Sequence, residues 1–301
     1  MTQGDRASWG IGLRILSGVL GAGMFICVKA VSDEVPLGEI VFFRSFFAFI
    51  PLIVFLWLRN EFPGGLRTKR PWAHVTRSAF GALALFTSFA AIARLNVAEA
   101  ILIAQLSPVL MAIAAVFLLS ERLTIWRVLG LALGFAGVVV LVWPELGGTS
   151  GSPERLIGYL IGLVSAVLSA LALIMVRNLN QTESPGAIAF YFVLASLIGA
   201  LLTLPLGWVI PDPQTLVLLM ASGLFGGFAH ITMTLAFRYA QASRLAPFEY
   251  LALFWPLLAD LFIFQLPLSS AFLLAAPLIL AGAIVAAAEG GRRAGQRRTT
   301  G

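Results

Sequence analysis

Ten apolar segments follow one another along this chain, with short polar connections between them. They fall at residues 12–31, 37–58, 73–93, 98–119, 124–143, 156–176, 186–208, 214–237, 244–265 and 269–288. A helix needs about 20 apolar residues to cross the hydrocarbon core of a bilayer. Inside that core every backbone polar group needs an internal partner, so each continuous apolar run is predicted to be a helix. The expected fold class is an all-α integral membrane protein with ten transmembrane helices.

The small supply of charged residues supports this prediction. Only 11% of the 301 residues are charged and 59% are hydrophobic, whereas a soluble domain carries about 25% charged residues. The net charge of +6 resides at segment ends, so nucleic acid is not an expected partner. One cysteine, Cys27, provides neither a disulfide framework nor a metal site. We expect no metal and no cofactor.

The distribution of Lys and Arg predicts the orientation in the membrane. With the N-terminus inside, sixteen of these residues lie on or near the cytoplasmic side, and only Lys29, Arg94 and Arg155 lie outside. This bias is the one that the positive-inside rule describes. We therefore expect a multi-pass protein of a bacterial inner membrane with both termini in the cytoplasm. The basic tail after Glu289 is expected to anchor this topology.

The chain also contains an internal repeat. Residues 80–140, moved forward by 145 positions without a gap, match residues 225–285 at fourteen positions, among them Gly81/Gly226 and Gly137/Gly282. Each copy holds five segments, and an odd number of spans inverts the second copy in the membrane. We expect a first five-helix repeat at residues 1–146 and a second, with the basic tail, at 147–301. Inverted repeats are typical of alternating-access transporters, whose substrate site lies at the repeat interface. One chain then holds both inverted repeats, so a monomer is expected to suffice for transport.

Specific strings add a family resemblance. Residues 106–124 (LSPVLMAIAAVFLLSERLT) and the glycine-spaced segment 130–144 closely resemble the end of the repeat in EamA-type transporters of the drug/metabolite transporter superfamily. Residues 121–124 match that family's Glu-Arg-Leu-Thr turn, and Arg44 matches an arginine usual in its second span. The resemblance covers essentially the whole chain as two repeats of five. The second repeat departs from the pattern, with Leu266 and Pro267 in place of Glu-Arg.

The resemblance implies a carrier that moves small organic solutes. Members of the family carry amino acids, including aromatic ones, other metabolites and cationic compounds. The phenylalanine-rich spans make an aromatic amino-acid exporter the favoured function. Uptake or export of other metabolites or cationic compounds is the alternative.

Polar and aromatic side chains inside the spans are the candidates for the site, because a charge at a helix centre costs at least about 2.5–3.5 kcal/mol. The candidates for substrate binding are His230, Gln105, Tyr250, Ser88, Ser165, Trp255 and Phe86. Those for coupling or gating are Arg44, Asp260 and Glu249. For each of them a structural hydrogen bond or ion pair is the competing interpretation.

Spacing singles out three of these positions. Gly223, Gly226 and Gly227 thin the helix that carries His230 and let a ligand or a neighbouring helix approach, and histidine titrates near neutral pH. Proton coupling is therefore one hypothesis and simple facilitation the other. Glu249 and Asp260 are eleven residues apart, which places both carboxylates on one helix face. Gln105 maps onto Tyr250 under the 145-residue offset.

Two other classes of function compete with a carrier. An intramembrane enzyme needs clustered catalytic groups, and the chain has no His-Glu-x-x-His, Gly-x-Ser-x-Gly or phosphate-loop motif. A channel usually forms its pore from several subunits, which a complete inverted pair makes unnecessary. A carrier is the favoured interpretation.

Overall fold

The computed structural model describes residues 3–119, 125–146, 152–239, 245, 248 and 251–299. Over these residues the chain is helical and forms no strand. The helices, in chain order, are α1 (Gln3–Val31), α2 (Leu37–Leu58), α3 (Pro71–Arg94), α4 (Val97–Ala104), α5 (Ser107–Leu119), α6 (Ile125–Leu146), α7 (Pro153–Leu179), α8 (Pro185–Leu201), α9 (Pro213–Tyr239), α11 (Phe254–Phe262) and α12 (Ser270–Thr299). Short 3-10 turns lie at η1 (Gly64–Leu66), η2 (Leu204–Leu206) and η3 (Leu251–Leu253).

Proline begins four of the long helices. Pro71, Pro153, Pro185 and Pro213 open α3, α7, α8 and α9. This position suits proline, because the first turn of a helix leaves its N–H groups unpaired in any case. Ser184 completes the start of α8 by accepting a hydrogen bond from the backbone N–H of Ala187 at 3.1 Å.

Membrane-spanning character is clearest in seven helical segments, which are long and apolar enough to cross a bilayer. They are Ser8–Val31, Leu37–Leu58, Pro71–Arg94, Val128–Leu146, Pro153–Leu179, Pro185–Leu206 and Pro213–Ala236. Shorter apolar helices lie at Val97–Met111, Leu251–Phe262 and Ser270–Val285. The predicted all-helical class is thus confirmed over the described residues, and these segments are consistent with several membrane crossings.

Two predicted segments are not continuous helices, and in this respect the sequence prediction is wrong. In segment 98–119, α4 ends at Ala104 and α5 begins at Ser107. Pro108 lacks the N–H that would continue the helical hydrogen bonds across this junction. In segment 244–265, the 3-10 turn η3 precedes the short helix α11.

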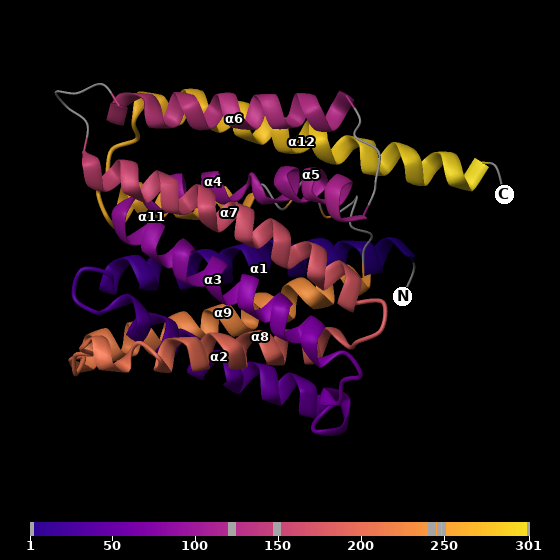
Figure 1. The fold of residues 1–301 in the computed structure, drawn as a ribbon, viewed down its shortest axis with the longest axis horizontal. Coiled ribbons are helices and arrows are strands. Elements are labelled where there is room, and N and C mark those ends of the chain that lie inside the picture. Colours follow the sequence, from indigo (N-terminus) through magenta and orange to yellow (C-terminus); the bar gives the residue numbers. More distant parts are fainter. Residues whose placement is uncertain are drawn as a thin grey trace.

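The helices pack as a layered bundle (Figure 1). At one edge α6 and α12 lie side by side, while α1 packs on α9 and α7 packs on α3. α2 contacts both α8 and α9, and α3 also contacts α8. The interrupted segments contact each other through α4 and α11.

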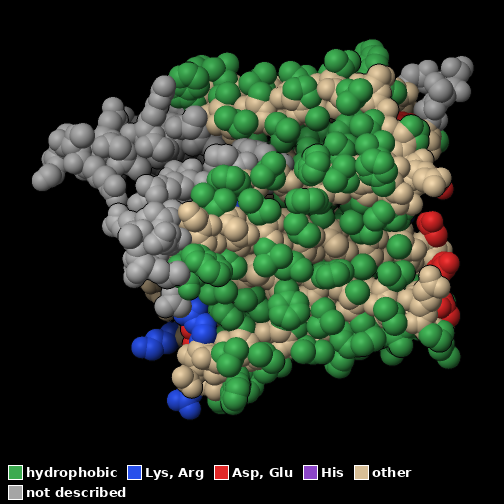
Figure 2. All heavy atoms as spheres, turned by 180° about the vertical axis from the view of Figure 1, so that it is seen from behind, with side chains coloured by type: hydrophobic (Ala, Val, Ile, Leu, Met, Phe, Trp, Pro, Cys, Tyr) green, Lys and Arg blue, Asp and Glu red, His purple; other side chains and the backbone are tan. Residues whose placement is uncertain are grey.

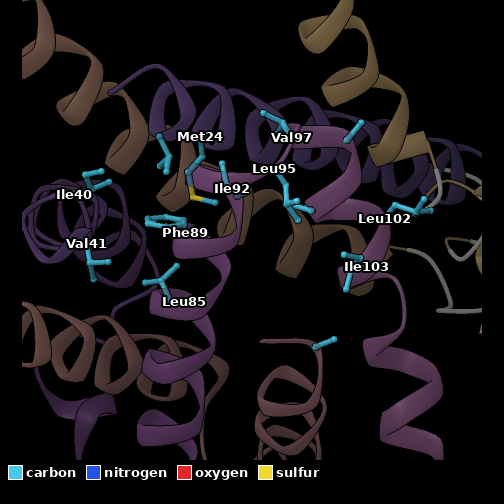
Figure 3. Packing of buried hydrophobic residues seen from close by; sticks show 14 of the residues in the cluster. Met24, Ile40, Val41, Leu85, Phe89, Ile92, Leu95, Val97, Leu102 and Ile103 are labelled. Carbon is cyan, nitrogen blue, oxygen red and sulfur yellow. The ribbon is translucent and has the colours of Figure 1, made fainter. Parts of the chain in front are cut away.

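The packed interior centres on α4 and its neighbours (Figure 3). Val97, Leu102 and Ile103 of α4 are fully buried in an apolar cluster that also holds side chains of α1, α2 and α3. Phe89 of α3 is also fully buried and meets the ring of Phe25 edge-on, with centroids 6.3 Å apart. Lipid tails are as apolar as these side chains, so close packing rather than exclusion from water holds such a bundle together.

The surface has an apolar middle and two charged ends of opposite sign. Large apolar side chains such as Ile50, Leu83 and Phe228 are about half exposed along the sides. Figure 2 shows hydrophobic side chains over this middle zone, Lys and Arg at one end, and Asp and Glu at the other. The basic end is the one where α1 begins and α12 ends (Figures 1 and 2).

Candidate functional site

Four helices bring basic and aromatic side chains together in the interior. Arg77 of α3 places its guanidinium carbon 4.4 Å from the centre of the Phe192 ring of α8. Arg44 of α2 lies 5.9 Å from the same centre. The imidazole of His230 on α9 meets this ring at a centroid distance of 6.2 Å. We call these four residues the basic cluster.

Two glycines make room for the basic cluster. A Cβ atom on Gly81 of α3 would lie 2.9 Å from the Phe192 ring and 3.2 Å from Nη1 of Arg77. A Cβ atom on Gly226 of α9 would lie 3.2 Å from Nε of Arg44. Gly226 is one helical turn before His230, so both face the cluster. The 145-residue offset pairs these two glycines.

The arginines of the basic cluster have no ionic partner within the described chain. The Arg44 side chain is almost completely buried, with the residue only 2% exposed. Nε and Nη1 of both Arg44 and Arg77 are buried without a hydrogen-bond partner. A guanidinium group stays protonated in proteins, so the cluster holds two positive charges that no described carboxylate neutralises. His230, in contrast, is exposed.

The other predicted binding residues are spread over several helices. Ser165 of α7 donates a hydrogen bond to the carbonyl of Ala84 in α3 at 2.9 Å. Ser88 is half-buried on α3, and Gln105 is half-buried at the break between α4 and α5. Among the predicted residues that the structure describes, Arg44 and His230 are the two that it brings together around one side chain, Phe192.

Two aromatic candidates border separate cavities. Phe86 lines an apolar groove of about 830 Å³ between α3 and α8, which extends from Thr68 to Thr203. Trp255 lines a smaller cavity of about 360 Å³ beside α1 and α9, and its indole Nε1 is buried without a partner in the described structure. Tyr250 and Glu249, like the Glu-Arg-Leu-Thr turn at 121–124, lie outside the described residues.

Asp260 of α11 holds the start of α4. Its carboxylate is fully buried and accepts hydrogen bonds from the backbone N–H groups of Val97 at 3.0 Å and Ala98 at 2.7 Å. These are free donors at a helix N-terminus, where a negative charge is also favoured. The aspartate thus connects the two interrupted segments directly.

A polar network ties the helices together at the acidic end. Arg155 of α7 donates to Glu145 of α6 at 2.7 Å, to Glu99 of α4 at 3.0 Å and to the hydroxyl of Tyr159 at 2.9 Å. The Glu99 side chain is 2% exposed, and it also accepts from the backbone N–H of Asn96. The network joins α4, α6 and α7.

A second set of contacts lies at the basic end. The Thr68 hydroxyl donates to Glu183 at 2.9 Å, Nε2 of His74 lies 3.4 Å from the same carboxylate, and Arg70 donates to Asn178 at 3.0 Å. Burial tends to raise the pKa of Glu183, but the contacts with Thr68 and His74 outweigh it and hold the pKa below its ordinary value. The loop before α3 is thereby fastened to the connection between α7 and α8.

Sequence reasoning missed Arg77 and Phe192. Arg77 was assigned to the cytoplasmic side in the count of positive charges, yet its guanidinium turns inward and is stacked on Phe192. The available signal was Gly81, one turn beyond Arg77 and paired with Gly226 by the repeat. Phe192 had no such signal, because it is one of 23 phenylalanines.

Comparison with known proteins identifies the family. The profile of the EamA-like transporter family matches residues 8–143. The S-adenosylmethionine uptake transporter of Rickettsia prowazekii is 31% identical over 75% of this chain and 74% of its own length. The chain belongs to the EamA-like transporter family. It is therefore a multi-pass membrane transporter of small molecules.

Other similar proteins extend the EamA-like relationship over more of the chain. The pseudopaline exporter CntI of Pseudomonas aeruginosa is 30% identical over 83% of this chain and 85% of its own length. The riboflavin transporter of Rhizobium johnstonii is 28% identical over 83% of this chain and 80% of its own length. A solved crystal structure with 25% identity covers 95% of the chain at a TM-score of 0.66. The three named transporters are named for S-adenosylmethionine, pseudopaline and riboflavin, and none of them for an aromatic amino acid.

Proposed function

We propose that this EamA-like protein is an alternating-access carrier made of two inverted five-helix repeats, residues 1–146 and 147–301. In this proposal it crosses a bacterial inner membrane ten times, and its substrate site is the basic cluster. The observation that supports the proposal is that the helix contacts recur when the two halves of the chain are exchanged. The first helix of one half packs on the third helix of the other half in both directions, as α1 on α9 and as α7 on α3.

Further contacts follow the same exchange. The second helix of each half packs on the third helix of the other, as α2 on α9 and as α8 on α3. The fourth segments, both interrupted, contact each other as well as the first helix of the opposite half. Interrupted helices at a repeat interface are a recurring feature of substrate sites in transporters.

The charged ends support the proposed orientation. Lys and Arg gather at the end where α1 begins and α12 ends, and Asp and Glu at the other (Figure 2). The positive-inside rule favours a cytoplasmic position for the basic end, and hence for both termini.

The two sets of polar contacts then have natural roles as gates. The Arg155 network would close the outer end, with Asp260 holding α4 in place. The Thr68, His74 and Glu183 contacts would close the inner end. Alternating access requires that these ends open in turn. Glu249, predicted on the same helix face as Asp260, is also proposed to take part in coupling or gating.

Amino acids are the proposed substrates, with aromatic ones favoured and export as the direction. The family resemblance supports this choice, as does the aromatic wall that Phe192 provides. Phe86, Ser88, Gln105, Ser165, Tyr250 and Trp255 are proposed as further contacts along the route. Uptake or export of other metabolites or of cationic compounds is the alternative, and the relatives are named for riboflavin, S-adenosylmethionine and pseudopaline.

Counterflow in proteoliposomes tests the carrier proposal. Vesicles loaded with one unlabelled solute are given the labelled solute outside, over a panel of amino acids, riboflavin and S-adenosylmethionine. A carrier gives a transient, saturable overshoot that His230→Ala diminishes. Flux that rises linearly with concentration would indicate a channel, and an aromatic series without exchange would exclude the favoured substrates.

A further inference from the structure

We propose that the transported solute carries a carboxylate, and that Arg44 and Arg77 bind this group together. The inference rests on the proposed function, and it names the chemical class of the substrate. It also assigns a binding role to Arg77, which lies outside the family pattern described above.

The first support is the charge of the basic cluster. Both guanidinium carbons lie within 6 Å of the Phe192 ring centre, so the two charges are separated by at most about 10 Å. Charges of the same sign at this separation repel, and more strongly inside a protein than in water. An anion between them would remove this repulsion.

The second support is that the buried acidic side chains among the described residues are engaged elsewhere. Glu39 shares α2 with Arg44, but it accepts a hydrogen bond from the backbone N–H of Val209 at 3.0 Å. Asp260 caps α4, and Glu99 pairs with Arg155. No described carboxylate contacts Arg44 or Arg77. Since burying an unpaired charge is strongly unfavourable, the proposal assigns the balancing negative charge to the solute.

The third support is the chemistry of the groups. A guanidinium presents parallel N–H donors that match the two oxygens of a carboxylate. Both guanidinium groups lie within cation–π distance of the Phe192 ring, which places them on one aromatic side chain. His230, the fourth member of the basic cluster, is exposed. Purely cationic compounds would be repelled here, which excludes one of the family's substrate classes.

Matched acids and amides test the inference without knowledge of the natural substrate. The purified full chain is heated in detergent with acetate or acetamide, benzoate or benzamide, and 3-phenylpropionate or 3-phenylpropionamide, at constant ionic strength. We expect at least one acid to raise Tm in a concentration-dependent manner while its amide has no effect. Equal effects of acid and amide, or no effect of any acid, would overturn the proposal.

Variants assign the effect to the arginines. Arg44→Gln and Arg77→Gln should each abolish the acid-dependent rise in Tm, and Arg77→Lys should weaken it, because lysine keeps the charge but lacks the planar fork. Arg94→Gln, on the exposed end of α3, is the control and should keep the full rise. Ligand-free Arg77→Gln should melt no lower than the parent chain, because an unpaired charge has been removed. A rise that persists in both glutamine variants would overturn the assignment.

Counterflow with the same proteins separates the two proposals. Acid-selective binding without exchange of any solute would overturn the carrier function and leave the anion site in place. Saturable exchange of the neutral amides, unchanged in the glutamine variants, would overturn the anion site and leave the carrier function in place.

Discussion

Gly137 of α6 and Gly282 of α12, which the 145-residue offset pairs, each lie against the other's helix. A Cβ atom on Gly282 would lie 2.6 Å from the carbonyl oxygen of Gly130 and 2.8 Å from the amide nitrogen of Gly134. A Cβ atom on Gly137 would lie 2.5 Å from the Ile279 side chain. The α6–α12 contact is thus close on both sides, as small residues permit between membrane helices.

We expect Gly282→Ala to destabilise the protein by about 1–3 kcal/mol, because backbone atoms cannot move aside as a side chain can. Thermal unfolding in detergent measures the effect. Gly21→Ala in α1 is the matched control, since a Cβ atom there meets nothing within 4 Å. Equal melting temperatures for the two variants would contradict the close contact.

Replacing Asp260 should loosen α4. Asp260→Ala leaves the N–H groups of Val97 and Ala98 without their acceptor, which should cost about 1–3 kcal/mol. Asp260→Asn should cost less, because one amide oxygen remains, and Asp33→Ala at an exposed position should cost little. If Asp260 instead carries a coupling proton, Asp260→Asn will abolish the pH dependence of transport while stability stays near normal.

Within the Arg155 network, loss of the Glu99 pair should destabilise the protein more than loss of the Glu145 pair. Arg155→Gln leaves the buried Glu99 without its partner, and we expect a loss of about 1–2 kcal/mol, since the arginine side chain is itself 30% exposed. Glu145→Gln keeps the Glu99 pair and should be milder. Chemical unfolding of both variants compares them, and a larger loss for Glu145→Gln would show that Glu99 does not depend on Arg155.

Stability at acid pH should depend on Glu183. Its pKa in the folded protein lies below the ordinary value, so its contribution is fully present above the unfolded pKa of about 4.3 and is lost as pH falls through the folded pKa. Glu183→Gln should therefore flatten the Tm against pH curve below about pH 4.3. Glu154→Gln, at an exposed position, should leave the curve unchanged. A curve that keeps its slope in Glu183→Gln would assign the acid sensitivity to other groups.

His230 should affect transport more than folding. His230→Ala removes a contact with Phe192 in the basic cluster, and we expect the apparent KM to rise about tenfold, which corresponds to about 1.4 kcal/mol. Transport measured across pH separates two roles for the histidine. If His230 carries the coupled proton, the alanine variant also loses the pH dependence of transport. If the pH dependence is unchanged, His230 contacts only the solute.

The sequence alone determined the class of this protein, because hydropathy over 20-residue windows reflects a requirement of the bilayer and not of any particular neighbour. The sequence alone also indicated the charged ends and the glycines at 81, 137, 226 and 282, which the internal repeat pairs. Arg44 and His230 stood out because polar groups inside apolar segments are rare.

Tertiary structure decided which of these residues meet. Arg77 and Phe192 are 115 positions apart in the chain, and only the packing of α3 on α8 brings them into contact. Likewise Asp260, predicted to share a helix face with Glu249 and to serve coupling or gating, lies against the start of α4, because the two interrupted segments pack on each other. Helix periodicity determines the face on which a side chain lies, whereas its partner depends on long-range packing, for which a single sequence carries no local signal.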